Sequence, residues 1–167
     1  MDNIIKYTKV REVKSPTRAT AVAAGIDFFV PRDFKSILLF PGHDVLIPSG
    51  IKASVPTRHM LYITNKSGVA SSNDAKTRAG LAQSNQLKDI LIKGADTIDE
   101  DYQGEIHLHL INVGKTSMCI EPDMKIAQGV IIPVNYATPV EVLSEQELFG
   151  KVESARKDKG FGSTSND

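Results

Sequence analysis

The chain has 167 residues, a length that suits one domain able to bury a core without disulfides or a metal. Its 20 basic and 20 acidic residues cancel, so no overall field directs it to nucleic acid or to an anionic membrane. The single cysteine, Cys119, excludes an intramolecular disulfide and a cysteine-based zinc site and fits a reducing cytoplasm. Without a signal peptide pattern or an apolar run of ~20 residues, we expect a soluble cytoplasmic protein that binds any anion through a local cluster.

Most of the chain predicts short β-strands, each closed by a turn. Apolar or alternating segments occur at residues 26–30, 37–40, 45–47, 51–55, 60–64, 105–110 and 126–134. Their spacing favours a sandwich or jelly roll over alternating βαβ units. Gly129 interrupts the last segment and suggests a β-bulge there. The predicted fold class is therefore all-β, a jelly-roll-like β-sandwich or barrel.

One short helix is predicted near the C-terminus. Ser144 and Glu147 have the spacing of a capping box, and Leu143 and Leu148 have that of a hydrophobic staple. Gly150 stands where a C-cap glycine belongs. The sequence therefore predicts a helix of about one turn that begins after Ser144 and ends before Gly150.

The remaining polar segments define the expected organisation of the chain. We expect residues 1–150 to form one β domain, because the polar residues 151–167 cannot form a core and predict a mobile C-terminal arm. A second polar segment, about residues 72–90, predicts an exposed insertion in the domain, with a short helix over residues 75–83.

Five segments carry polar or charged residues in a characteristic order. They are residues 24–28 (Ala-Gly-Ile-Asp-Phe), 65–71 (Asn-Lys-Ser-Gly-Val-Ala-Ser), 94–105 (Gly-Ala-Asp-Thr-Ile-Asp-Glu-Asp-Tyr-Gln-Gly-Glu), 124–128 (Met-Lys-Ile-Ala-Gln) and 156–164 (Arg-Lys-Asp-Lys-Gly-Phe-Gly-Ser-Thr). Together they resemble the five ordered motifs of the trimeric dUTPases, over almost the whole chain. The resemblance implies hydrolysis of dUTP to dUMP and diphosphate, a homotrimer with active sites shared between chains, and Mg²⁺ held mainly by the triphosphate. The insertion resembles that of some phage members, for which the compartment is the host cytoplasm.

The third segment places two carboxylates and a tyrosine on a turn before a strand. If the segment is extended, Asp99 and Asp101 point to one side and Tyr102 to the other. By itself this pattern is most often an ordinary polar turn. The resemblance implies that Asp99 is the general base for a water that attacks the α-phosphorus, and that Tyr102 packs against the deoxyribose and excludes a 2′-hydroxyl. It also implies that the uracil edge pairs with the backbone around Ala95, Thr97 and Ile98.

The second segment offers phosphate donors. Lys66, Ser67 and the amide of Gly68 form a small cluster suited to phosphate oxygens, although alone they would read as a Ser-Gly turn with a solvated lysine. The family usually has arginine where Lys66 stands, and lysine lacks the bidentate fork. An alternative register would place the motif at residues 78–82 (Arg-Ala-Gly-Leu-Ala), but it loses the serine.

The first and fourth segments each set one polar residue in an apolar strand. A buried Gln128 needs hydrogen-bond partners, and the resemblance implies that it reaches the phosphate or metal-water region. Lys125 replaces the family's usual arginine. The resemblance implies that Asp27 contacts the metal through water, and a purely structural hydrogen-bonding role fits its sequence context equally well.

The arm retains a few residues that suit a lid which orders on ligand. The resemblance implies that Phe161 stacks over the uracil. It also implies phosphate or substrate contacts from Arg156, Gly162, Ser163 and Thr164. Without the resemblance, a solvated tail would be the simpler interpretation.

Three other interpretations of the site and its function stay open. His107 and His109 share one strand face, but two ligands without a third are weak evidence for a metal. The related dCTP deaminases share the jelly-roll trimer and are the nearest enzymatic alternative. A regulatory protein that binds nucleotide and contacts a partner protein through the insertion is an alternative of another class.

Overall fold

The computed structural model describes residues 4–66, 91–93, 96–150 and 154. Its contacts divide the chain into two units, Met1–Asn135 and Tyr136–Asp167. The expected insertion at 72–90, its predicted helix at 75–83, and all of the expected arm except Ser154 lie outside the described residues. In the part of the chain that is described, no helix has the length and apolar character needed to cross a membrane.

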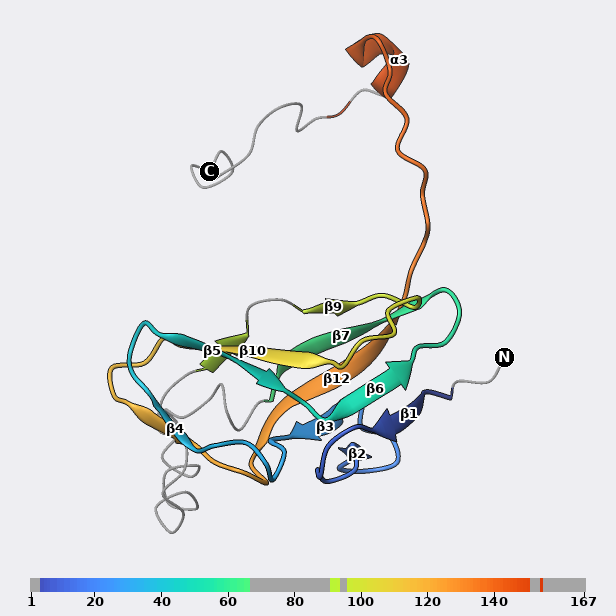
Figure 1. The fold of residues 1–167 in the computed structure, drawn as a ribbon. Coiled ribbons are helices and arrows are strands. Elements are labelled where there is room, and N and C mark those ends of the chain that lie inside the picture. The colour runs from blue at the N-terminus through green and yellow to red at the C-terminus, as the bar shows by residue number, and fades with distance from the viewer. Residues whose placement is uncertain (1–3, 67–90, 94–95, 151–153, 155–167) are drawn as a thin grey trace. The chain divides into compact units, whose positions relative to one another are not determined.

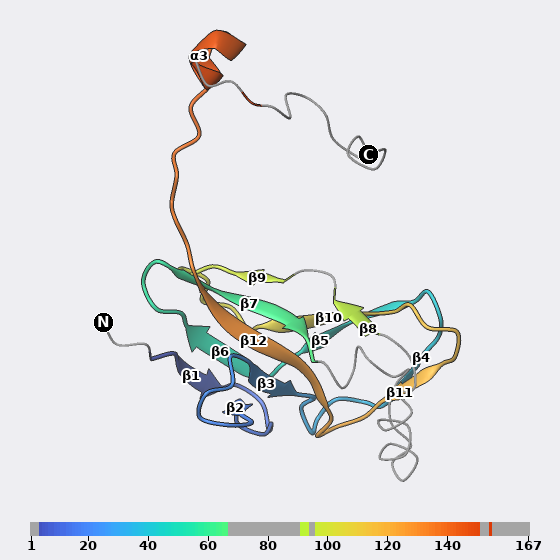
Figure 2. The same ribbon diagram turned by 180° about the vertical axis from the view of Figure 1, so that it is seen from behind.

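A five-stranded antiparallel sheet forms the back of the first unit (Figure 1). Its order is β2 (Thr17–Arg18), β3 (Ile26–Phe29), β12 (Lys125–Pro133), β7 (His59–Asn65) and β9 (Thr97–Ile98). The long strands β12 and β7 pair over seven residues and lie side by side in both views (Figures 1 and 2). This pairing fixes where the flanking strands β3 and β9 can lie.

Three smaller sheets complete the unit. One has the order β5 (Asp44–Pro48), β10 (His107–Asn112) and β8 (Leu91–Lys93). The others pair β1 (Lys6–Lys9) with β6 (Ile51–Ser54), and β11 (Met118–Ile120) with β4 (Ile37–Leu39). All of these pairings are antiparallel.

One hydrophobic core joins the sheets. In β10, Leu108 and Leu110 are buried, while His107 is exposed and His109 between the leucines is half-buried, as the predicted alternation requires. These leucines share the core cluster with Leu61 and Ile63 of β7. The predicted all-β, jelly-roll-like fold is confirmed, with one short helix in the part of the chain that the structure describes.

Gly129 has a different role from the predicted one. It pairs regularly with Ile26 and Ile63, and the irregular step in β12 lies between Lys125 and Ala127. A Cβ at Gly129 would stand 2.7 Å from Cδ1 of Leu61, so the glycine serves close packing between strands rather than a bulge.

The predicted helix in the second unit is confirmed as α3 (Glu145–Phe149). Ser144 Oγ accepts a hydrogen bond from the Glu147 amide at 3.2 Å, and Gly150 has a φ of 60°. The expected staple is wrong, because Leu143 is 95% exposed and so does not pack against Leu148.

Candidate functional site

A buried carboxylate on the five-stranded sheet lies between two lysines. Asp27 on β3 is 3% exposed. Its Oδ1 accepts a hydrogen bond from Lys66 Nζ at 3.3 Å, and its Oδ2 lies 2.7 Å from Lys125 Nζ. The second contact is an ion pair without hydrogen-bond geometry, which is why Oδ2 has no hydrogen-bond partner. We call Asp27, Lys66 and Lys125 the lysine cluster; its net charge is one positive unit.

Gln128 lies against the same cluster. It pairs with Asp27 across the sheet, and its Nε2 donates to the Asn65 carbonyl at 3.0 Å. A Cβ at Gly25 would stand 2.3 Å from Gln128 Oε1, so only glycine leaves room for this side chain. The structure therefore brings together the polar residues of the first and fourth motifs with Lys66 of the second.

A turn at residues 99–106, which we call the Asp99 turn, follows β9. Asp99 is exposed, and its carbonyl accepts a hydrogen bond from the Tyr102 amide at 3.2 Å. The segment is therefore not extended, and the alternation expected for Asp99, Asp101 and Tyr102 does not apply. The Tyr102 hydroxyl donates to the Glu105 carbonyl at 3.0 Å, which fixes the ring although the residue is 42% exposed.

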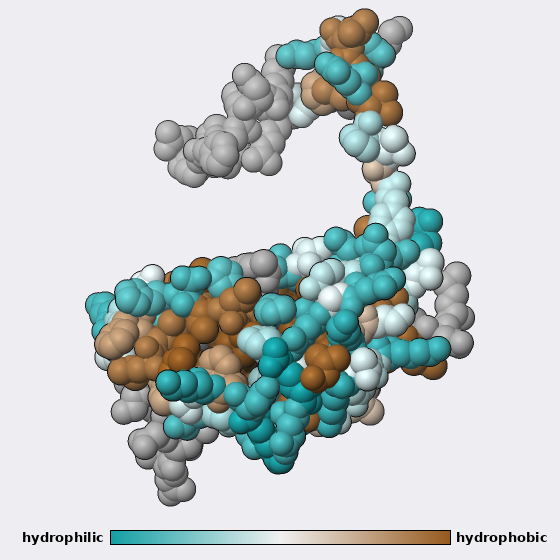
Figure 3. Space-filling model, in the orientation of Figure 1, coloured by the Kyte–Doolittle hydropathy of each residue, from teal (hydrophilic) through white to brown (hydrophobic). Residues whose placement is uncertain are grey.

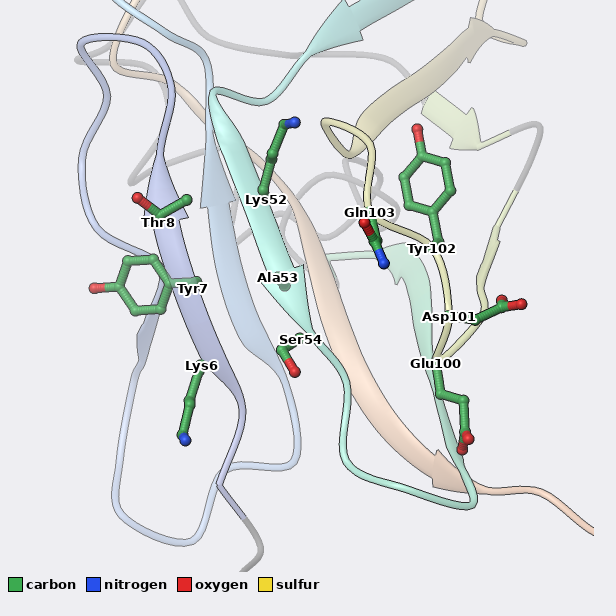
Figure 4. A pocket seen from close by; sticks show the side chains of 10 residues that line it. All are labelled: Lys6, Tyr7, Thr8, Lys52, Ala53, Ser54, Glu100, Asp101, Tyr102 and Gln103. Atoms are coloured by element: carbon green, nitrogen blue, oxygen red, sulfur yellow. The ribbon is translucent and has the colours of Figure 1, made fainter.

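The turn forms one wall of an open groove of about 450 Å³ (Figure 4). The other wall is formed by β1 and β6, with Lys6, Tyr7, Thr8, Lys52, Ala53 and Ser54. In this view the Asp101 side chain points away from β1 and β6. The groove is lined by Tyr102, to which the resemblance assigns contact with the sugar.

The Asp99 turn and the lysine cluster are far apart within one chain. Asp27 aligns with Gln128 and Thr64, while Ile98 aligns with Leu61. Three strand spacings and three residues along the strand place the Cα atoms of Asp27 and Ile98 roughly 17 Å apart. A general base must lie within hydrogen-bond reach of its water, so these two groups do not form one compact site within one chain.

Thr97 and Ile98, which were predicted as substrate-binding residues, form β9 and precede the turn directly. Thr97 is exposed, and its Oγ1 donates to Asp96 Oδ1 at 3.4 Å. Ile98 is half-buried and packs against the core. The backbone of this strand is therefore anchored on β7 immediately before Asp99.

The histidines on β10 pair locally. His107 Nδ1 lies 2.9 Å from the Glu105 carbonyl, and His109 Nε2 lies 2.7 Å from Asp44 Oδ2. The hydrogen bond to His109 lowers the pKa of Asp44 below its ordinary value. Within the described residues, no group of three or more His, Cys, Asp or Glu side chains could hold a metal ion.

The residues around Asp27 do not fit direct ligation of Mg²⁺. Oδ2 is buried and free of hydrogen bonds, as a ligand atom could be, but an ammonium group stands 2.7 Å from it and repels a cation. The second ammonium, on Lys66, neutralises the other oxygen. The arrangement instead offers positive charge to an anion.

Several predicted site residues lie outside the described residues, so their placement stays a prediction. These are Ser67, Gly68, Ala95, Arg156, Phe161, Gly162, Ser163 and Thr164. Lys125 was noted in the sequence only as a replacement, and its ion pair with Asp27 now makes it a site candidate. The local sequence around Lys125 did not reveal this partner, because Asp27 lies on a strand about 100 residues earlier in the chain.

Comparisons with known proteins agree on one family. The family model for dUTPase matches residues 11–165. The deoxyuridine 5′-triphosphate nucleotidohydrolase of Chlamydia pneumoniae is 38% identical over 149 residues, which are 89% of each chain.

Solved structures of phage proteins share the fold. The Staphylococcus bacteriophage 80alpha dUTPase with dUPNHPP has a TM-score of 0.71 and 21% identity, covering 98% of this chain and 99% of that one. A dUTPase from phage phi11 of S. aureus, described with a structural Mg(II) ion, has a TM-score of 0.65 and 18% identity, covering 86% of this chain and 99% of that one.

Proposed function

This chain belongs to the dUTPase family and is a dUTP diphosphatase, and we propose that Asp99 activates the water that attacks the α-phosphorus of dUTP. The water oxygen bonds to phosphorus, its proton passes to the Asp99 carboxylate, and diphosphate leaves with the electrons of the broken P–O bond. The observation that carries the proposal is an exposed carboxylate three residues from a fixed tyrosine. The family match favours this reaction over deamination of dCTP.

Tyr102 supports selectivity for the deoxyribose. Its hydroxyl donates a hydrogen bond to the Glu105 carbonyl, so the substrate meets the face of the ring and not the hydroxyl group. A ring in a fixed position rejects a 2′-hydroxyl by steric exclusion. We propose that the backbone of Thr97 and Ile98, which is held on β7, pairs with the uracil edge.

The lysine cluster supports binding of the triphosphate. Both ammonium groups are held by one buried carboxylate, which orients them while their combined charge still exceeds that of Asp27. Lys66 is 30% exposed and Lys125 is 37% exposed, so each can turn part of its donor set to an anion. We propose that Gln128 borders the same phosphate region.

We propose that Mg²⁺ is the cofactor and that it binds mainly to the phosphate oxygens of dUTP, where it would neutralise part of their negative charge. The contact of Asp27 with that ion is proposed through water only. A structural Mg(II) ion in a phage dUTPase is consistent with the use of this metal in the family.

A homotrimer with shared sites is proposed as the active form. The separation of roughly 17 Å between the cluster and the turn supports a site completed by a second chain. Apolar side chains also gather on the face over β4, β5 and β10, where Leu38, Phe40 and Leu46 are each at least 50% exposed (Figure 3). The arm, residues 151–167, would then supply Phe161 and Arg156 to a neighbouring chain.

A second, regulatory role is proposed for the insertion at residues 72–90. The phage 80alpha protein is described among dUTPases that control transfer of virulence genes. Replacing residues 73–88 by a short Gly-Ser linker should keep dUTP turnover, because a long surface loop adds little to stability. Loss of turnover in a variant that still assembles would assign the segment to the catalytic site instead.

The decisive experiment measures diphosphate release from dUTP, UTP, dTTP and dCTP with Mg²⁺. Asp99→Asn should lower kcat by ~10²–10⁴-fold with little change in binding, as the loss of a general base does. Asp101→Asn is the matched control, because it changes an exposed carboxylate two residues along the same turn. Near-normal turnover by Asp99→Asn, or turnover of UTP comparable to that of dUTP, would refute the proposed roles.

A further inference from the structure

The Asp99 turn is attached to the rest of the domain through carboxylates at both ends. Near its C-terminal end, Glu105 Oε1 accepts hydrogen bonds from the Gly50 amide and from Arg11 Nε, each at 2.8 Å. Near its N-terminal end, the Glu100 carboxylate accepts one from the Arg58 amide. Both glutamates therefore bond to groups outside the turn.

The attachment at Glu105 is the more shielded of the contacts around Arg11. The Glu105 side chain is 15% exposed, compared with 50% for Asp33, the other carboxylate that Arg11 binds. Hydrogen bonds between charged groups are stronger than neutral ones, and screening by salt weakens as exposure falls. The carboxylate also accepts from a backbone amide, so it links the turn to two separate segments.

The main chain next to Glu105 is fixed in the same place. The Ser49 amide donates to the Ile106 carbonyl, and the Ile106 amide donates to the Ile51 carbonyl, each at 2.9 Å. Gly50 lies between these partners with a φ of +73°, and a Cβ there would stand 2.9 Å from Val13. The carboxylate of Glu105 therefore binds a loop that has little room to shift.

Tyr102 depends on this anchored main chain. Its hydroxyl donates to the Glu105 carbonyl at 3.0 Å. Its ring lies over Gly104, where a Cβ would stand 2.3 Å from the hydroxyl oxygen and 2.4 Å from the ring carbon Cζ. Any shift of residues 104–105 must therefore move the ring or break its hydrogen bond.

We propose that Glu105, held by Arg11 and Gly50, is a positioning residue that sets the place of Tyr102 and thereby the discrimination between dUTP and UTP. Its carboxylate is directed to Arg11 and the Gly50 amide, so it acts through the tyrosine rather than on the substrate. This inference rests on the proposed role of Tyr102.

The test compares kcat/KM for dUTP and UTP in Glu105→Gln, Glu105→Ala and the control Glu12→Gln. Glu12 is 72% exposed and pairs with Arg32, so its substitution removes a surface ion pair without touching the turn. Glutamine keeps an acceptor for the Gly50 amide but loses the charge that binds Arg11. We expect the ratio of dUTP to UTP efficiency to fall by a few-fold in Glu105→Gln and by about tenfold or more in Glu105→Ala, the loss that one charged hydrogen bond corresponds to.

A double-mutant cycle separates positioning from general destabilisation. Tyr102→Phe removes the hydroxyl that links the ring to Glu105, so adding Glu105→Ala to it should change the selectivity ratio much less than Glu105→Ala does alone. An additive effect, or an unchanged ratio in folded Glu105→Gln, would overturn the inference. Failure of the unmodified enzyme to hydrolyse dUTP would instead refute the proposed function, because the inference concerns only the ratio between substrates.

Discussion

Removal of the Asp27 charge should destabilise the domain, because it leaves two ammonium groups near a buried position without their counter-charge. Asp27→Asn keeps the size of the side chain and an oxygen acceptor. Breaking a buried ion pair from one side typically costs 3–5 kcal/mol. Here both lysines are about one-third exposed and can turn toward water, so we expect a loss of ~2–3 kcal/mol in the free energy of unfolding.

The measurement is urea unfolding at one protein concentration, since assembly makes the apparent stability depend on it. Glu12→Gln is the matched control. Glu12 is 72% exposed and its ion-pair partner Arg32 is 54% exposed, so we expect the free energy of unfolding to change by about 0.5 kcal/mol or less. A cycle with Lys125→Met, which keeps the length of the side chain over the Phe29 ring, should show a coupling of ~1–2 kcal/mol with Asp27→Asn. A loss below about 0.5 kcal/mol, or no coupling, would refute the view that Asp27 organises the lysines.

Three further substitutions test other parts of the structure. Gly104→Ala should displace the Tyr102 ring and lower dUTP turnover by up to about 100-fold, while the circular dichroism spectrum stays unchanged. Normal kinetics in this variant would contradict the described packing of the ring on Gly104. Gly129→Ala should cost ~1–3 kcal/mol in urea unfolding, because its Cβ would stand 2.7 Å from Leu61 and 3.0 Å from Phe28; equal midpoints would show that the strands yield. The lowered pKa of Asp44 means that its ionised form is favoured by folding, so wild type should exceed Asp44→Asn in stability above about pH 4. That advantage should vanish as the pH falls through the lowered pKa, and a difference that persists at about pH 2 would exclude this origin.

Some strands were predictable because their buried apolar residues recur at a period of two. In β10, Leu108 and Leu110 are buried in the core, while His107 and His109 are not. β1 was missed because all four of its residues are exposed, so no hydrophobic alternation marks it. β9 was missed because two residues are too few to show a period; its pairing with β7 defines it.

The capping residues of α3 could also be predicted from the local sequence, because the cap joins two residues that are only three positions apart. The staple was not, because it depends on whether two leucines have anything to pack against, and Leu143 is 95% exposed. Gly129 is a similar case. Its place in an apolar run suggested a bulge, but the glycine is needed because the side chains of Leu61 and Phe28 on neighbouring strands leave no room for a Cβ.

The sequence by itself determined the fold class, the family and the identity of the polar residues set in apolar strands, because periodicity and ordered motifs are properties of the chain alone. Only the tertiary structure decided which charges meet. Strand pairing brought Asp27 between Lys66 and Lys125, and a separate set of contacts fastened Glu105 to Arg11 and Gly50. Such contacts join residues that are dozens of positions apart, and their geometry follows from register and close packing rather than from local composition.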